Sequence, residues 1–390
     1  MILYRLAFKN IYGAGLRTWL NVVALSFSFV AIIYMQGLYN GMRDQMENVS
    51  IDVQYAGGHY WHQSYDPYDP LTLDDAHGRA PADLQKLVKG EKAMPILVRR
   101  GIIYPHGRFQ NILLKGISPE QNIVTMPTHV LKNGGGAIPA LIGERMAKSA
   151  GLAKGDQVMV SWRDARGTFD AREIEIAGIM RTDVSDIDNG QLWIPIETMR
   201  EMMAMPHEAT IIVLEKGSLF DETIEQWEHK DLTFLMKDIR ALFLSKSIGG
   251  SILYITLLLL AMLAIFDTQI LSIFKRRKEM GTMMALGMTR SKIIQLFTLE
   301  GTLHAVLAVL VAALYGIPLL IYAARTGFGL PEVADSFGMS LGSRIYPAFT
   351  AGLVVGTILL VLMATTIVSY LPTRKIAKLK PTDALRGKMT

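Results

Sequence analysis

The sequence contains no cysteine, so disulfide bonds, thiolate metal sites and lipids attached to cysteine are excluded for its 390 residues. Charged residues are also scarce: they make up 19% of the chain, whereas hydrophobic residues make up 50%. This balance is too apolar for an average soluble protein and too polar for a chain made only of membrane spans. We therefore expect one membrane part and one globular part.

A second absence concerns nucleotide binding. The sequence has no G-x-x-x-x-G-K-[ST] pattern, in which backbone N–H groups and a lysine hold the phosphates of ATP. Residues 247–251 (SIGGS) are faintly similar to an ATPase signature, but small residues at the start of a membrane helix explain them better. No nucleophile with a neighbouring base stands out either. We expect no catalytic residue and no cofactor bound by this chain.

Metal ligands are weak candidates as well. Asp186, Asp188 and Glu197 match part of a calcium-binding loop, but glycine and glutamine occupy the positions that need a ligand and a glycine. His59 and His62 precede two aspartates, without a third fixed ligand, so a polar loop is the better interpretation. We therefore predict no metal site.

Four apolar segments are long enough to cross a bilayer, which takes roughly 20 mostly apolar residues in a helix. The predicted transmembrane helices cover residues 18–39, 248–274, 300–322 and 347–371. The first is longer than the apolar core of a typical signal peptide and no small-x-small cleavage site follows it, so we interpret it as a retained anchor. Residues 40–247 have the composition of a globular domain, and residues 323–346 form a short outer loop.

Basic residues flank the spans unevenly and predict the orientation of the chain. Residues 1–17, 275–294 and 372–390 are rich in lysine and arginine, whereas residues 40–247 contain more acidic than basic side chains. The positive-inside rule therefore places the three basic segments in the cytoplasm and the large domain outside. The net charge of +5 reflects this topology and not nucleic-acid binding. Residues 1–17 predict an amphipathic elbow helix, with an ordinary basic flank as the alternative.

Short strands dominate the predicted outer domain. Alternating or continuous apolar runs predict strands at 140–142, 157–162, 173–179, 191–194 and 210–214, with helices at 144–150 and 196–203. One helix for every two or three strands predicts an α+β sandwich and not a doubly wound sheet. The expected fold class is therefore an α-helical membrane protein with four transmembrane helices and an α+β extracytoplasmic domain between the first two.

Apolar residues with helical spacing continue beyond the first span and precede the second. They predict two helices that extend out of the membrane and pair as a stalk, and two separate surface helices are the alternative. The predicted stalk residues are Met42, Met46, Leu232, Leu235, Ile239 and Leu242.

The inner loop, residues 275–294, predicts a short cytoplasmic helix with a face of methionines. Methionine repacks readily on changing surfaces, so this face is a candidate contact for a partner protein. A helix held on the membrane surface by its basic residues is the alternative. The candidate coupling residues are Arg276, Arg277, Glu279, Met280, Gly281, Met283, Met284, Ala285, Leu286, Gly287 and Met288.

Three segments carry recurrent patterns in a fixed order: LAFKNIYGAGLRTWL at 6–20, RRKEMGTMMALGMTRSKI at 276–293 and YLPTRKIAKLKPTDALR at 370–386. They resemble, respectively, the approach to the first span, the coupling segment and the segment after the last span of one group of ABC transporter permeases. This group is shared by lipoprotein-releasing complexes, macrolide-export pumps and FtsX-like division permeases. LIGERMAKSAGLAKGDQVMV at 141–160 is more loosely similar to part of their periplasmic domain.

The resemblance implies a non-enzymatic permease subunit of the bacterial inner membrane, with both termini in the cytoplasm. It implies a dimer with a second permease copy or paralogue, and two separate ATPase subunits that bind ATP and magnesium. Their movement would be relayed to the outer domains by mechanotransmission. The expected cargo is a lipoprotein or another hydrophobic molecule, taken from the lipid bilayer and passed to a periplasmic acceptor or adaptor. The alternatives are macrolide-type efflux and FtsX-like regulation of a cell-wall hydrolase.

Overall fold

The computed structural model describes residues 16–132, 136–182, 185–218, 224–329 and 344–376. The predicted elbow helix, most of the basic tail and the middle of the short outer loop lie outside these residues. The chain divides into two compact units. Among the described residues, the helical unit comprises those up to Met42, Leu242–Gly329 and those from Arg344 onward, and the outer unit comprises those of Arg43–Ala241.

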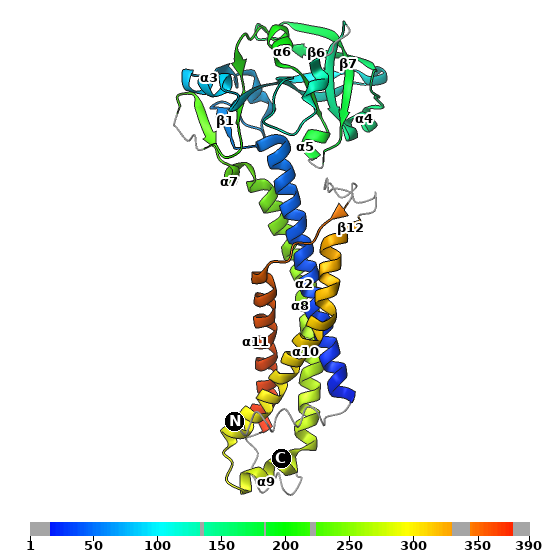
Figure 1. Ribbon diagram of the computed structural model, residues 1–390, viewed down its shortest axis with the longest axis vertical. Helices are drawn as coiled ribbons and strands as arrows, with labels where there is room; N and C mark the ends of the chain where they lie inside the picture. Colours follow the sequence, from blue (N-terminus) through cyan, green and yellow to red (C-terminus); the bar gives the residue numbers. More distant parts are fainter. Residues whose placement is uncertain (1–15, 133–135, 183–184, 219–223, 330–343, 377–390) are drawn as a thin grey trace. The chain divides into compact units, whose positions relative to one another are not determined.

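Four long helices form the helical unit and run side by side (Figure 1). They are α2 (Leu16–Ser50), α8 (Lys237–Lys275), α10 (Arg290–Thr326) and α11 (Ala351–Ile376). Each is long and apolar enough to cross a membrane. Side chains from all four helices form one apolar core, which includes Phe29, Ile265, Ala308 and Val361. Many other leucine and isoleucine side chains of these helices are exposed on the chain, as expected for surfaces that face lipid.

Two glycines of α2 allow the backbone before α11 to approach closely. A Cβ atom at Gly41 would lie 2.0 Å from the carbonyl oxygen of Tyr346, and one at Gly37 would lie 2.2 Å from the ring of Phe349. The N–H of Ala348 donates a hydrogen bond of 2.8 Å to the carbonyl oxygen of Gly37. The spacing of the two glycines is the small-xxx-small pattern that lets a backbone pack against a helix.

The described part of the outer unit contains a nine-stranded sheet with the order β11-β1-β10-β3-β4-β8-β5-β7-β6. The strands are β1 (His59–His62), β3 (Ala93–Ile103), β4 (Gln110–Ile117), β5 (Ile138–Gly143), β6 (Gln157–Arg163), β7 (Phe169–Met180), β8 (Gln191–Pro195), β10 (Ile211–Leu214) and β11 (Trp227–Lys230). The pairs β4–β8 and β5–β7 are parallel, and the other pairs are antiparallel.

β3 also pairs with β6, and this pairing closes six of the strands into a barrel. An apolar cluster that includes Leu97, Ile142, Val160, Ile176 and Ile194 draws its side chains from all six barrel strands or their neighbours. The predicted α+β composition is confirmed, but the predicted sandwich is wrong, because the β3–β6 pairing joins the two ends of the strand series. Closure also removes the free edges that an open sheet would leave unpaired.

Shorter elements complete the described fold. The short helices are α3 (Ala82–Lys89), α4 (Glu144–Ala150), α5 (Ser185–Asp188), α6 (Ile196–Met202), α7 (Leu232–Leu235) and α9 (Arg277–Ala285). One short π-helix is η1 (Ile51–Tyr55), and the short 3-10 helices are η2 (Pro70–Asp74), η3 (Pro105–Gly107) and η4 (Thr128–Lys132). Two-residue strands are β2 (Gly78–Arg79), β9 (Glu208–Ala209), β12 (Phe328–Gly329) and β13 (Arg344–Ile345).

The strands and helices that the sequence predicts in the second half of the outer domain are confirmed as β5, β6, β7, β8, β10, α4 and α6. The longest missed element is β3, in which Pro95, the adjacent Arg99 and Arg100, and Gly101 interrupt the apolar alternation. Because β3 is paired with β4, β6 and β10, its neighbours stabilise a strand whose local signal is weak.

Candidate functional site

The inner connection between α8 and α10 consists of the short helix α9 and a turn (Figure 1). α9 ends at Ala285, and Gly287 has φ +94°, a left-handed conformation that glycine adopts readily. The hydroxyl of Thr289 then accepts a hydrogen bond of 3.4 Å from the N–H of Lys292 and caps α10. The prediction of one helix over residues 275–294 is therefore wrong after Ala285: Gly287 and Met288 lie in the turn.

The methionine side of α9 packs against this chain. Met280 is only 2% exposed and clusters with Ile273 of α8 and with Ile293 and Phe297 of α10. Met283, Met284 and Met288 are partly buried against the same cluster, and Gly281 is buried beside them. The interpretation of the methionine face as the outward-facing surface is therefore wrong, because the ends of α8 and α10 cover it.

The open surface of the connection lies at the other candidate residues. Leu286 is 83% exposed, which is unusual for a large apolar side chain outside the membrane spans. Its neighbours Ala285 and Gly287 are exposed, as is Glu279 on α9. Arg277 is the first residue of α9. The structure thus separates the candidate coupling residues into a buried methionine group and an exposed group centred on Leu286.

Arg276 links the start of α9 to α10. Its Nε lies 2.8 Å from Oε2 of Glu279, and its Nη1 lies 3.0 Å from Oε2 of Glu300. The guanidinium also stands 5.0 Å from the centre of the Phe297 ring, within range for a cation–π contact. Glu300 is 5% exposed, so the charge of this arginine offsets part of the cost of burying its carboxylate.

Further polar side chains lie near Glu300 where α8, α10 and α11 meet. A Cβ atom at Gly301 would lie 2.0 Å from Oγ of Ser369 and 2.9 Å from Nε2 of Gln269, so the three helices are in close contact. Nδ1 of His304 donates a hydrogen bond of 2.7 Å to the carbonyl oxygen of Glu300. The sequence gave no signal for Gln269 or Ser369.

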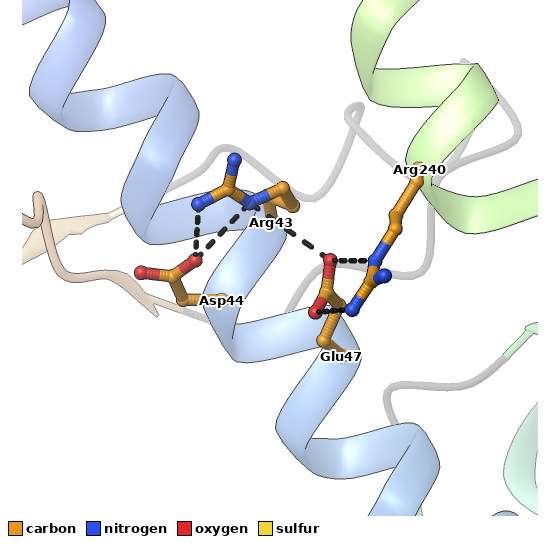
Figure 2. Close-up of polar contacts among 4 residues, drawn as sticks. All are labelled: Arg43, Asp44, Glu47 and Arg240. Carbon is orange, nitrogen blue, oxygen red and sulfur yellow. Dashed lines mark hydrogen bonds and ion pairs between the residues drawn. The ribbon is translucent and has the colours of Figure 1, made fainter. Parts of the chain in front are cut away.

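In the outer unit, an ion pair joins the end of α2 to the start of α8 (Figure 2). Nε of Arg240 lies 3.1 Å from Oε1 of Glu47, and Nη2 lies 3.2 Å from Oε2, so the pair is bidentate. Arg43 lies between two acids: its Nη2 is 2.9 Å from Oδ1 of Asp44 and its Nε is 3.9 Å from Oε1 of Glu47. These charged contacts had no counterpart in the sequence interpretation, which considered only apolar stripes.

The predicted stalk residues fall on three helices. Met42 and Met46 are half-buried in α2, Leu232 and Leu235 lie in α7, and Ile239 and Leu242 lie in α8. A turn at Met236 separates α7 from α8, and it shifts the spacing of the buried side chains. The buried residues are therefore Leu235, Met236 and Phe243, whereas Leu242 is exposed. The role of the predicted residues as a stalk remains a prediction.

The candidate metal ligands have structural contacts instead. The ring of His59 is buried in β1, where Nε2 lies 3.0 Å from the carbonyl oxygen of Gln54 and Nδ1 accepts a hydrogen bond of 3.1 Å from Trp61. Burial lowers the pKa of His59 to about 4. Asp188 accepts hydrogen bonds from the backbone N–H groups of Glu144 and Arg145, at 2.8 and 3.3 Å, and so caps α4 from a distant position in the chain.

In a comparison with known proteins, two family models match successive parts of this chain. The family model of the MacB-like periplasmic core domain matches residues 18–230, and that of the FtsX-like permease C-terminal region matches residues 251–381. The two matches define a permease that carries a periplasmic core domain between membrane-spanning helices. The chain belongs to this family of ABC transporter permeases, as the three sequence segments implied.

Relatives differ in how much of the chain they share. The macrolide export ATP-binding/permease protein MacB of Neisseria meningitidis is 26% identical over 239 residues, which cover 56% of this chain and 34% of that protein. The lipoprotein-releasing system transmembrane protein LolC of Xylella fastidiosa is 21% identical over 389 residues, which cover 90% of this chain and 88% of that protein. The crystal structure of the periplasmic region of MacB from Actinobacillus actinomycetemcomitans is 12% identical and covers 49% of this chain and 95% of that chain, with a TM-score of 0.33.

Proposed function

We propose that this chain is the transmembrane subunit of an ABC transporter, and that it converts movement of separate ATPase subunits into movement of its outer domain. The surface that supports this proposal is the exposed turn at Leu286. An apolar side chain that is 83% exposed on the inner connection provides a contact for a partner protein. Two ATPase subunits would bind ATP and magnesium, and this chain would contribute no catalytic residue.

The contacts of Arg276 support a route from that surface into the membrane. The guanidinium contacts Glu279 on α9 and Glu300 on α10 at the same time. Because the buried methionines also pack α9 on the ends of α8 and α10, displacement of α9 would move these two helices with it. The proposed complex has a second permease copy or paralogue in the bacterial inner membrane, with its termini in the cytoplasm.

The proposed cargo is a lipoprotein or a similar hydrophobic molecule, which the complex would extract from the outer leaflet and pass to a periplasmic acceptor. The observation that carries this choice is the alignment with LolC, which covers 90% of this chain and 88% of that protein. The second candidate is macrolide-type efflux with an adaptor, because the macrolide export protein is the more identical of the two, at 26%. The chain spans only 34% of the length of that protein, however.

Purification of the tagged full chain from native membranes tests the coupling surface. We expect an ATP-hydrolysing subunit to copurify with the wild type and with Leu286→Met, which keeps an apolar side chain. Leu286→Asp should insert normally but lose that subunit at least tenfold, because a charged group replaces the apolar contact. Equal recovery of the ATPase with Leu286→Asp, or no ATPase with any form, would rule out this surface.

The cargo is tested with the copurified complex in proteoliposomes. We expect ATP-dependent release of a lipidated protein into the aqueous phase, and no such release when ATP is replaced by ADP. ATP-dependent movement of a macrolide, without release of the lipidated protein, would favour the second candidate. If neither cargo moves while ATP is hydrolysed and a cell-wall hydrolase copurifies, the regulatory alternative replaces both.

A further inference from the structure

A groove of about 710 Å³ opens on the described part of the outer unit. It lies over the second half of β3, the start of β4, the end of β6 and the start of β7, with η2 along one side. Its volume falls within the range of roughly 300–1,000 Å³ that is typical of small-molecule sites. Every residue that lines it belongs to the outer unit, so the groove is complete within that unit.

The charges that line the groove do not balance. Three arginines line it, Arg99, Arg100 and Arg163, against the single carboxylate of Asp74. Oδ2 of Asp74 forms an ion pair with Arg100, whose Nη2 lies 2.7 Å away. Nε of Arg163 donates a hydrogen bond of 3.3 Å to the carbonyl oxygen of Gly167. That oxygen carries only a partial charge, so it does not neutralise the guanidinium. Two of the three cations therefore have no carboxylate in contact within the described outer unit.

Arg99 is the most informative of the three, because it is only 4% exposed. Its Nη1 donates to the carbonyl oxygen of Leu73 and, at 3.2 Å, to that of Asp74. Burial lowers the pKa of the Arg99 guanidinium, and the negative charge of Asp74 partly offsets this. A buried cation without an ion-pair partner destabilises a fold, and such groups are found where a ligand supplies the missing charge.

Apolar side chains stand next to these cations. Phe169, at the first position of β7, is 79% exposed, and Tyr104, which follows β3, is also exposed. Exposed aromatic rings beside arginine are typical of surfaces that bind ligands with an apolar body and a charged end. The hydroxyl of Tyr104 lies 3.3 Å from Oγ of Ser161, so polar atoms are also available between the rings and the arginines.

The pairing of β3 leaves no edge of that strand open to a peptide. Residues 101–103 of β3 pair with β4 on one side and with β6 on the other. An additional strand therefore cannot pair with this part of β3. The site suits a small molecule that reaches the guanidinium groups through its own anionic end.

We propose that this groove binds a small amphiphilic anion, with its carboxylate or phosphate held by Arg99, Arg100 and Arg163 and its apolar body against Tyr104 and Phe169. Guanidinium groups bind both oxyanions through paired N–H donors, so the two headgroups share one recognition chemistry. This site is independent of the proposed coupling to ATPases, and its absence would leave that proposal unaffected.

Calorimetric titration of the full chain in nanodiscs of zwitterionic lipid tests the site, with phenyl phosphate, benzoate and neutral benzyl alcohol as probes. We expect saturable binding of at least one anion, at one molecule per chain, and none of the alcohol. Arg163→Gln should weaken anion binding about tenfold or more, since a hydrogen-bonded charge is lost. Arg172→Gln, an exposed arginine on β7 that does not line the groove, is the matched control and should bind as the wild type does.

Phe169→Ala tests the apolar half of the site separately from the arginines. It should weaken the binding of phenyl phosphate several-fold and leave the binding of inorganic phosphate unchanged. Whichever aromatic anion binds more tightly identifies the preferred headgroup. The proposal is overturned if neither anion saturates, if Arg163→Gln binds equally well while its thermal unfolding matches the wild type, or if benzyl alcohol binds as tightly. Binding of an acidic peptide alone, with no small anion, would also overturn it in favour of a protein partner.

Discussion

Nη1 of Arg276 contacts both oxygens of the buried carboxylate of Glu300, at 3.0 Å from Oε2 and 3.2 Å from Oε1. The same side chain reaches Glu279 through Nε at 2.8 Å. One arginine thus joins a membrane helix to the short helix of the inner connection. An apolar cluster that includes Met280 and Phe297 also joins α9 to α10, so the connection is fixed by charge and by packing.

Removal of the arginine should destabilise the helical unit. Arg276→Gln removes the cation that lies 3.0 Å from the buried carboxylate of Glu300, and we expect the free energy of unfolding in nanodiscs to fall by about 3 kcal/mol. The double variant Arg276→Gln/Glu300→Gln should recover part of this loss, because no uncompensated charge remains. Glu279→Gln is the control: the side chain of Glu279 is exposed, so the change should stay below about 1 kcal/mol. A double variant less stable than Arg276→Gln would contradict the ion-pair explanation.

The close approach at Gly41 predicts a strong effect of one methyl group. Gly41→Ala would place a Cβ atom 2.0 Å from the carbonyl oxygen of Tyr346, so residues 344–349 must move away from α2. We expect a cost of about 1–3 kcal/mol, as for other overpacked sites, and faster hydrogen exchange at Ala348. The matched control is Gly356→Ala in α11, where no atom lies within 4 Å of the added Cβ. It should be neutral or slightly stabilising, since alanine favours helix.

The pair of Glu47 and Arg240 predicts a rescue by exchange of charges. Glu47→Arg places three like charges together with Arg43 and Arg240, and Arg240→Glu places an acid opposite Glu47 (Figure 2). Each single variant should therefore speed amide exchange in the last turns of α2, measured by mass spectrometry on the full chain. The exchanged pair, Glu47→Arg/Arg240→Glu, should restore protection. Asp44→Asn serves as the control because Asp44 contacts Arg43 and not Arg240, and it should change exchange little.

Acid should destabilise the outer domain through His59. In the folded protein Nδ1 of His59 accepts from Trp61, so a proton on that nitrogen breaks this hydrogen bond inside a buried sheet. The pKa of His59 is lowered from 6.5 to about 4, so the unfolded chain binds the proton first as the pH falls. Stability contributed by the neutral ring is therefore complete above pH 6.5 and is lost between pH 6.5 and about 4.

The expected loss at His59 is on the order of 3 kcal/mol across that interval. It is measured as the pH dependence of chemical unfolding, followed by the fluorescence of tryptophan. His59→Gln removes the titrating group but can still donate and accept hydrogen bonds, so its unfolding should depend less steeply on pH between 4 and 6.5. Identical slopes for the variant and the wild type would assign the acid sensitivity to other groups.

The membrane helices could be predicted closely because their signal is local. A helix that crosses a bilayer must satisfy its backbone hydrogen bonds internally and present apolar side chains over its whole length, and α8 and α11 do so in uninterrupted runs. Similar reasoning predicted β6 and β7, whose alternating residues reflect one buried and one open face. It missed β3, in which Arg99 and Arg100 interrupt the pattern and partner strands supply the stability.

The short helix of the inner connection was predicted in position, but the face that it exposes was not. The sequence placed a coupling element at residues 275–294 and marked its methionines, and the structure has α9 there. The predicted contact residue Met280 is buried, however, while Leu286 is exposed. The spacing of apolar residues identifies which side chains share one face of a helix. It does not distinguish a face that packs against the same chain from a face that binds a partner protein, because both have the same spacing.

The amino-acid sequence by itself determined the four apolar helices of the described residues, the family of the chain and the strands with clear alternation. Each of these depends on the pattern of apolar and polar residues that are close together in the chain, because this pattern decides which side chains contact water or lipid. The barrel closure between β3 and β6, the arginine groove, and the pairs Arg276–Glu300 and Glu47–Arg240 were decided only by the tertiary structure. Each of them joins residues far apart in the chain, and the free energy of such contacts depends on distance and burial, which local sequence patterns do not encode.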